Sequence, residues 1–537
     1  MRLRLALRKQ MPILILALMG CLFLLTPADA KTIHLRIIHI NDLHGYAEPH
    51  RPYGSAESLG GVAYLAGRVM QLKAEKKIPT LLLAAGDMLQ GNLWTNLNRG
   101  RGMIELMNLM RLDAMVVGNH EFDFGQEALR SRIAEAAFPI LGANVAGSTR
   151  LKPYVIKKVG GLRVGILGVV TKETATLTHP ANVRGVTFSS PEEACARYMP
   201  ELRREADVIV VMSHIGYAGD LRLAERVHGL HAIIGGHSHT KLQRPHMVGN
   251  TAIVQAWEHG KALGVLDLTL RDGQVIKAEG RLEEIKPVGG EPDPGIAALV
   301  SRYAAAVDGA MGDIIGRSCA DLNGEYVRYE ETNLGNMVAD VIRGGVGADI
   351  ALTNAGSIRA SVKKGDISLR HVYDVLPFGN YVVVMKLTGK QILRTLEHGL
   401  AHAGEGGGAF LQMSGLRVVY DSSAPAGNRV REARVGEAPL NLEQEYMVAV
   451  NDFMAAGGDG YDFLKSPTVA GDDDRGRLVV EMVADFIREK GEICPKTEGR
   501  IRQLARPSQG YLSPAKRDHH QPSAAIRDRE VYYPAPR

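Results

Sequence analysis

The sequence predicts a layered α/β domain followed by a second, smaller α/β domain. From residue 31 to about 285, short apolar runs of β character alternate with helix-like stretches, which is typical of layered α/β folds. A Pro/Gly-rich break at 284–295 then separates this region from further strand and helix patterns that continue to about residue 505.

The first domain is predicted to span residues 31–285. Its strand candidates are short runs rich in branched residues and bounded by glycine or polar residues. They are IHLRIIHI, TLLLAAG, DAMVVGN, FPILGANV, RVGILGVV, DVIVVMS and HAIIGG. Helix candidates such as GVAYLAGRVMQLKAEKK and GMIELMNLMR lie between them.

Residues 286–311 are predicted to form a connector and a linker helix, and the Pro/Gly-rich stretch at 284–295 is a candidate hinge. The second domain is expected over residues 312–505, with strands such as YVVVMKLTG, LRVVYD and YMVAVND. Residues 506–537 are polar, Pro-rich and without periodicity, which predicts a disordered tail.

Residues 1–30 have the layout of a secretory signal peptide. A basic start is followed by an apolar run and by the small-x-small triplet Ala28-Asp29-Ala30, so we expect cleavage before Lys31. A lipoprotein signal at Cys21 is the alternative, but the apolar run continues past that residue to Leu25. We therefore expect a periplasmic or secreted protein, without stable membrane insertion because the run is too short for a span.

Charge and cysteine content narrow the function classes. Much of the net charge of +5 lies in the signal segment, so the mature chain gives no electrostatic indication of a nucleic acid polymer or an anionic membrane as partner. The mature chain keeps three cysteines and no C-x-x-C motif, which argues against a thiolate zinc site. At most one disulfide is expected, and Cys319 with Cys494 is the predicted pair.

Ligand-type side chains follow five of the predicted strands of the first domain. In open α/β folds, functional groups gather at the carboxyl ends of the strands. The residues are Asp42 and His44, Asp87, Asn119, His120 and Asp123, His214, and finally His237 and His239.

Each of these residues taken alone is weak evidence. Asp87 could be a turn residue or a helix cap, His214 a buried polar residue, and GGHSH a Gly-rich turn. Taken together, the order D-x-H, G-D, G-N-H-E-x-D, H and G-G-H-x-H is specific, and it predicts a two-metal site.

These motifs resemble those of the calcineurin-like metallophosphoesterases. The chain from about residue 31 to 505 resembles the exported 5′-nucleotidase / UDP-sugar hydrolase family more specifically, because NAGSIR, LPFGN and NDFMAAGGDGYDF in the second domain also match. The resemblance implies that the site lies between the two domains.

The resemblance also implies a ligand set for two divalent ions, such as Zn²⁺ or Mn²⁺. Asp87 would bridge the ions, Asp42, His44 and His239 would complete one, and Asn119, His214 and His237 would complete the other. Two such ions hold and neutralise a phosphoryl group and activate the attacking water. Some family members have glutamine in place of His239, and histidine favours a softer metal.

By the same resemblance, His120 is the catalytic histidine that faces the phosphoryl oxygens and the leaving group. Asp123 would orient its imidazole and keep it protonated. Glu121, between them, receives no role. Four glycines are expected to let the backbone pass close to the metals: Gly45, Gly86, Gly118 and Gly236.

Substrate recognition is expected from the second domain, again by resemblance. Arg328 and Arg359 would contact phosphate or ribose oxygens, which suits the fork of the guanidinium. The remaining substrate-binding residues would be Asn354 on the base, Phe378 and Phe453 stacking on it, and Asp459 on the ribose hydroxyls. Family members often have three glycines where this chain has Ala355-Gly356-Ser357, so the base preference stays open.

The sequence therefore predicts a nucleotide-catabolic 5′-nucleotidase that releases phosphate from nucleoside 5′-monophosphates. UDP-sugars and nucleoside polyphosphates are further candidate substrates. One alternative is a 2′,3′-cyclic-nucleotide 2′-phosphodiesterase / 3′-nucleotidase of the same superfamily, although NDFMAAGGDG favours the nucleotidase. A second alternative is a non-catalytic surface-binding protein on this scaffold, against which the complete ligand set argues.

Overall fold

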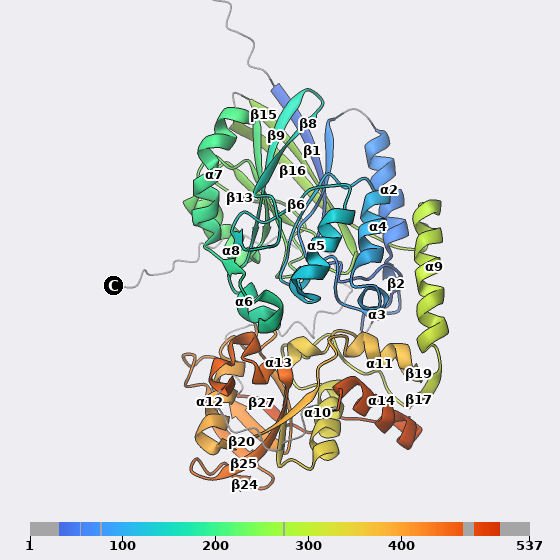
Figure 1. Cartoon of the computed structure of the whole chain (residues 1–537), viewed down its shortest axis with the longest axis vertical. Helices are drawn as coiled ribbons and strands as arrows, with labels where there is room; N and C mark the ends of the chain where they lie inside the picture. Colours follow the sequence, from blue (N-terminus) through green and yellow to red (C-terminus); the bar gives the residue numbers. More distant parts are fainter. Residues whose placement is uncertain (1–31, 54, 76–77, 272–273, 466–476, 505–537) are drawn as a thin grey trace, which may run out of the picture.

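The computed structural model describes residues 32–53, 55–75, 78–271, 274–465 and 477–504. The predicted signal peptide and the predicted C-terminal tail lie outside these residues. The described residues form two α/β domains, one above the other in Figure 1. Among their helices, none combines the length and the apolar character that a membrane span requires.

Two six-stranded sheets form the centre of the first domain. The strand order of one is β16 (Gln274–Glu284), β15 (Ala262–Arg271), β1 (Thr32–Ile40), β4 (Thr80–Ala84), β5 (Ala114–Val116) and β6 (Ile140–Leu141). The order of the other is β13 (His246–Val248), β14 (Thr251–Gln255), β12 (Ala232–Gly235), β11 (Val208–His214), β9 (Leu162–Val170) and β8 (Tyr154–Val159).

The sheets pack face to face, with helices on both outer sides. In β1, Leu35 and Ile37 belong to the core between the sheets, whereas Ile38 and Ile40 contact the helical layer outside. Burial on both faces explains why such strands are continuous apolar runs. The outer layers are α2 (Val62–Ala74), α4 (Arg101–Leu109) and α5 (Gly125–Glu135) on one side, and α7 (Pro191–Glu205) and α8 (Tyr217–Arg226) on the other.

Strand direction places the candidate site. Strands β1, β4, β5 and β6 run parallel to one another, and so do β9, β11, β12 and β14. Parallel strands end at the same edge of a sheet, so the polar loops that follow them are brought together. The predicted strand runs are confirmed as strands, and the two sheets also contain β8, β13, β14, β15 and β16, which were not among those runs.

The linker helix is α9 (Pro294–Met311). It begins as its sequence suggests, because Asp293 caps it by accepting a hydrogen bond from Ile296 N at 2.9 Å, and Pro294 occupies its first turn. Ile296 and Val300 pack into the helical layer of the first domain. The stretch before α9 is also fixed to this domain, since Asp293 N donates to Ala63 O. The start of the connector is therefore fixed to the first domain, whereas Asp308 near the end of α9 pairs with Arg370 of α11 (Leu369–Val375) in the second domain. The domain bounds and the candidate hinge at 284–295 stay predictions.

The second domain contains a four-stranded sheet, β20 (Val382–Thr388), β25 (Glu445–Asn451), β18 (Ile350–Asn354) and β21 (Leu411–Ser414). Its helices are α10 (Asn333–Val346), α11 (Leu369–Val375), α12 (Gly389–Leu400) and α14 (Val479–Lys490). A second four-stranded sheet is ordered β24 (Ala438–Pro439), β23 (Val430–Val435), β22 (Leu416–Tyr420) and β27 (Ile501–Gln503).

Side chains of both domains meet across the interface. Asn96 Nδ2 donates to Pro377 O at 2.8 Å, and Leu93 N donates to Asp374 Oδ1 at 2.9 Å. Arg370 of α11 pairs with Glu48 of the first domain. These contacts hold the carboxyl ends of the parallel strands against the second domain.

The predicted disulfide between Cys319 and Cys494 is present. It lies at the ends of β17 (Ile314–Ser318) and β26 (Glu492–Ile493), which pair in a small sheet with β19 (Gly365–Ser368). The cysteines are 175 residues apart in sequence, so the bridge closes almost the whole second domain into one loop. Cys195 is buried and free.

Loss of this bridge is expected to destabilise the second domain by about 2–5 kcal/mol, because a long closed loop restricts the unfolded chain. The measurement is the thermal unfolding of a Cys319→Ser/Cys494→Ser variant, with hydrogen exchange of the β17 and β26 peptides. Reductant should lower the unfolding temperature of the wild type and leave that of the variant unchanged. Equal unfolding temperatures of the two proteins without reductant would contradict the expectation.

Candidate metal centre and active site

The residues of the predicted metal site lie at the carboxyl ends of five strands, or in the loops that follow them, within the parallel parts of the two sheets. Asp42 and His44 follow β1, Asp87 follows β4, Asn119 follows β5, His214 ends β11, and His237 and His239 follow β12. Five of these seven residues have left-handed backbone, with φ of 51° at Asp42, 46° at His44, 54° at Asp87, 77° at His237 and 51° at His239. Such conformations each cost on the order of 1–3 kcal/mol and cluster at functional sites.

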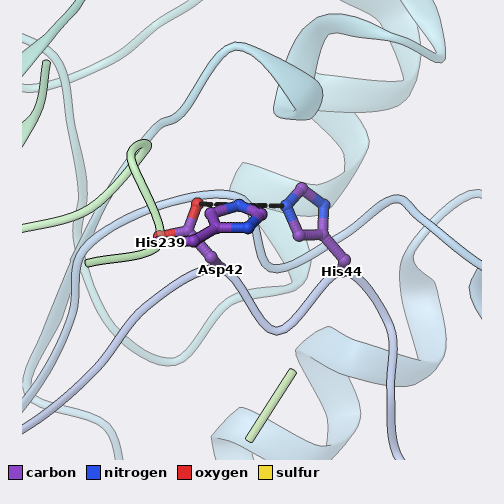
Figure 2. Close-up of side chains that lie close together, drawn as sticks. All are labelled: Asp42, His44 and His239. Carbon is purple, nitrogen blue, oxygen red and sulfur yellow. Dashed lines mark hydrogen bonds and ion pairs between the residues drawn. The ribbon is translucent and has the colours of Figure 1, made fainter. Parts of the chain in front are cut away.

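The first group of ligand-type side chains is Asp42, His44 and His239 (Figure 2). His239 Nε2 lies 3.3 Å from Asp42 Oδ1 and 3.2 Å from His44 Nε2. His44 Nε2 lies 3.9 Å from Asp42 Oδ1. Three donor atoms thus converge from two loops that are far apart in sequence.

The second group is Asp87, His214 and His237. Asp87 Oδ2 lies 3.0 Å from His214 Nε2, and the rings of His214 and His237 are 5.1 Å apart between centroids. Asp87 Oδ2 is also only 3.8 Å from His44 Nε2. Asp87 therefore stands between the two groups, where a bridging carboxylate would be.

Buried ligand-type atoms fit a cation at this place. Asn119 Oδ1 is buried and has no hydrogen-bond partner within the described part of the chain, and the buried His214 Nε2 faces the Asp87 carboxylate. Burial lowers the pKa of His237 to about 3, and burial together with Arg359 holds that of His44 well below its ordinary value. These two imidazoles are therefore neutral near pH 7, and coordination needs the neutral form. Burial also lowers the pKa of His214 and His239, but the carboxylates that face them outweigh it and raise the values to about 10 and about 9, so these two would lose a proton on binding a cation.

The remote nitrogens of the histidines are used for orientation. His214 Nδ1 lies 2.7 Å from Ala85 O, and His44 Nδ1 lies 3.1 Å from Gln90 O. His239 Nδ1 pairs with the carboxylate of Glu258. In each case Nε2 is left to face the donor cluster, an arrangement typical of metal-binding histidines.

Gly86 and Gly118 are required because the loops pass so close to these side chains. A Cβ at Gly118 would lie 2.1 Å from Asp87 Oδ1, and one at Gly86, where φ is 84°, would lie 2.5 Å from His214 Nδ1. Any larger residue would displace the ligands.

His120 lies beside the metal-ligand side chains, and its imidazole is oriented by a neighbouring carboxylate. Its Nδ1 lies 2.6 Å from Asp123 Oδ2, as the sequence led us to expect. The other oxygen of that carboxylate accepts a hydrogen bond from Thr178 Oγ1 at 2.6 Å. Thr178 lies in the irregular stretch between α6 (Thr174–Leu177) and η2 (Pro180–Val183), so sequence patterns carry no signal for it.

Glu121, to which the sequence assigned no role, has a structural role. Its side chain is buried, and its two oxygens accept four backbone hydrogen bonds. The donors are Asp87 N at 2.9 Å, Met88 N at 2.8 Å, Leu89 N at 3.1 Å and Gly118 N at 2.6 Å. One carboxylate thus ties the loop that carries Asp87 to the loop that carries Asn119.

Two of the predicted substrate residues of the second domain reach the cluster. Arg359 Nη2 lies 3.3 Å from His44 Nε2. The ring of Phe378 stacks toward that of His120, with 6.0 Å between centroids and 28° between planes. Arg359 Cζ is 5.8 Å from the Phe378 ring. The two domains therefore share one site.

The other predicted substrate residues lie nearby with different partners. Asn354 Nδ2 donates to Asp459 Oδ2 at 2.7 Å, and Asn354 Oδ1 accepts from Asn451 Nδ2 at 2.8 Å. The Asn354 amide thus already orients Asp459. Phe453 packs against Gly458, where an added Cβ would be 2.4 Å from its ring. Arg328 is close enough for its charge to act on both Arg359 and Asp459.

We expect Glu121→Gln to destabilise the protein by about 2–3 kcal/mol, because an amide oxygen cannot replace a carboxylate toward four N–H groups. It should also lower bound metal and phosphatase activity at least about tenfold, because the loops that carry Asp87 and Asn119 are no longer held together. Glu127→Gln, an exposed change in the first turn of α5, is the matched control. Metal content, activity and unfolding temperature are measured for both variants and the wild type. Values for Glu121→Gln equal to those of the wild type and of Glu127→Gln would contradict this role of Glu121.

Comparisons with known proteins agree with this arrangement. The family model for calcineurin-like phosphoesterase matches residues 35–241, and that for the 5′-nucleotidase C-terminal domain matches residues 312–466. Snake venom 5′-nucleotidase of Naja atra is 33% identical over 528 residues, which cover 88% of this chain and 98% of the relative.

Trifunctional nucleotide phosphoesterase protein YfkN of Bacillus subtilis is 32% identical over 88% of this chain, which spans only 35% of that longer relative. The crystal structure of the 5′-nucleotidase precursor from Thermus thermophilus superposes with a TM-score of 0.83 at 36% identity, over 88% of this chain and 100% of that one. With both domains matched and the metal-ligand groups in place, the chain belongs to the 5′-nucleotidase family of calcineurin-like phosphoesterases.

Proposed function

We propose that this protein is an exported enzyme that releases phosphate from nucleoside 5′-monophosphates. The observation that carries the proposal is the meeting of two unlike groups of residues. A carboxylate–imidazole cluster of the first domain, suited to a phosphoryl group, lies within 3.3 Å of Arg359 and beside Phe378 of the second domain. Nothing in a simple phosphate-binding site would require an aromatic ring at that place.

The donor set fits two divalent ions. Asp42, His44 and His239 would hold one ion, Asn119, His214 and His237 the other, and Asp87 would bridge them. Mixed imidazole and oxygen donors favour Zn²⁺ or Mn²⁺. When bound, such a pair neutralises the phosphoryl group and activates the attacking water.

The chain's own residues would then divide the remaining work. His120, held by Asp123 and through it by Thr178, is placed to donate a hydrogen bond or a proton to the phosphoryl or leaving oxygen. Arg359, which is partly buried, offers its positive charge to the phosphate. Phe378 would stack on the base, and Asp459, fixed by Asn354, would accept from the ribose hydroxyls.

Export rests on the signal-peptide pattern of residues 1–30. The Cys319–Cys494 disulfide supports it, because disulfides persist in oxidising compartments such as the periplasm or the extracellular space. The stretch NDFMAAGGDG favours the nucleotidase over the cyclic-nucleotide alternative, and the two kinds of substrate are compared in the same assay.

Phosphate release should be measured from AMP, UDP-glucose, 2′,3′-cyclic AMP and an aryl phosphate, with Mn²⁺ or Zn²⁺ added. We expect AMP to be a good substrate and Asp87→Asn to remove the activity together with bound metal. Faster turnover of 2′,3′-cyclic AMP than of AMP would favour the phosphodiesterase, and no turnover with any metal would favour a non-catalytic protein.

A second variant tests nucleoside recognition. Phe378→Ala/Phe453→Ala should lower kcat/KM for AMP at least about tenfold, since base–aromatic stacking contributes about 1–3 kcal/mol. Hydrolysis of the aryl phosphate, which has no nucleoside to hold, should change little. Phe486→Ala is the control, because that ring lies on α14 beside Lys490 and is not one of the proposed substrate residues. Equal losses on both substrates would assign the two rings to folding or domain contact.

A further inference from the structure

The loop after β14, residues 256–261, is a sixth strand-end loop beside the site, although it carries none of the proposed metal ligands. Its backbone is joined to the loop of Asp42. His259 N donates to Asp42 O at 2.7 Å, and Asn41 Nδ2 donates to Trp257 O at 2.6 Å. Trp257 and His259 have left-handed φ of 65° and 55°. The backbone of this loop is therefore strained at two residues, and its hydrogen bonds to the Asp42 loop stabilise that conformation.

Glu258 is the residue that this shape presents to the site. One oxygen of its carboxylate pairs with His239 Nδ1. The other accepts a hydrogen bond from Lys261 Nζ at 2.6 Å. His239 and Lys261 thus hold the carboxylate from both sides, and the Glu258 side chain is only 16% exposed.

Lys261 is an unusual partner because its side chain is only 2% exposed. A buried ammonium is costly unless it is paired. Its Nζ lies 4.1 Å from the centre of the Trp257 ring and 4.0 Å from Glu325 Oε1, which belongs to the second domain. The chain thus keeps a buried cation where its closest partner is the carboxylate behind His239.

His239 differs in this respect from two other histidines of the site. The remote nitrogen of His214 faces the carbonyl of Ala85, and that of His44 faces the carbonyl of Gln90 with Arg359 Nη2 3.1 Å away. Only the remote nitrogen of His239, among these three, faces a carboxylate. A carboxylate behind an imidazole fixes the ring and makes its other nitrogen a stronger donor. His239 Nε2 is the atom that points at Asp42 and His44.

We infer that Glu258, held by Lys261, is a positioning residue for His239 and selectively strengthens cation binding by the Asp42–His44–His239 half of the site. This inference rests on the two-ion site proposed above. The opposite half, with Asn119, His214 and His237, does not depend on Glu258.

The test is the release of Mn²⁺ from the loaded full-length mature protein during titration with a chelator, with the ions counted by mass spectrometry. The wild type should release two ions. In Glu258→Gln, one ion should be bound about 10–100-fold more weakly, as for other carboxylates behind a ligand histidine, and the second should be unchanged. Glu258→Asp keeps a carboxylate near Lys261, but its shorter side chain no longer reaches His239. It should therefore weaken the binding of the same ion as Glu258→Gln does.

Glu325→Gln is the matched control, because it removes a carboxylate near Lys261 and leaves the Glu258–His239 pair intact; its release curve should equal that of the wild type. Thermal unfolding of the chelator-treated variants distinguishes an effect on metal binding from an effect on stability alone. A merely structural role of Glu258 would lower the unfolding temperature without changing Mn²⁺ release. Unchanged release, or equal weakening of both ions, would overturn the role of Glu258. A wild type that releases a single ion would overturn the two-ion site itself.

Discussion

The carboxylate of Glu121 accepts hydrogen bonds from four backbone N–H groups, and the rest of the site depends on that convergence. Three of the donors belong to residues 87–89 and the fourth to Gly118. Asp87 and Asn119 can only approach the same place if the loops after β4 and β5 are held together. A buried N–H without a partner is costly, so a carboxylate that satisfies four of them fixes both loops at once.

The work of the site is divided between the domains. The first domain supplies a rigid cluster whose ligand-type residues sit in left-handed backbone and are mostly buried. The second domain supplies Arg359 and Phe378, which reach that cluster across the interface. In the proposed enzyme, the groups that act on the phosphate would lie at the strand ends, whereas recognition of the nucleoside would depend on how the second domain packs against the first. The hydrogen bond between Asn354 and Asp459 fixes the Asp459 side chain without any bound substrate.

Much of this was predictable from sequence, because parallel strands align the residues that follow them. The positions of Asp42, Asp87 and His237 at strand ends follow from such patterns. Glu121 escaped because it acts on backbone N–H groups that have no sequence signature. Thr178 escaped because it lies in an irregular stretch. Glu258 follows a strand end, after β14, and the same rule applied once more would have found it.

In the proposed metal centre, Asp87, fixed through Glu121, would stand between two metal ions. Anomalous diffraction from crystals of the mature protein soaked in Mn²⁺ tests this arrangement most directly. The account predicts two peaks about 3.5–4 Å apart, one on each side of the Asp87 carboxylate. One peak should adjoin Asp42, His44 and His239, and the other Asn119, His214 and His237. A single peak, or two peaks of which only one touches Asp87, would contradict it.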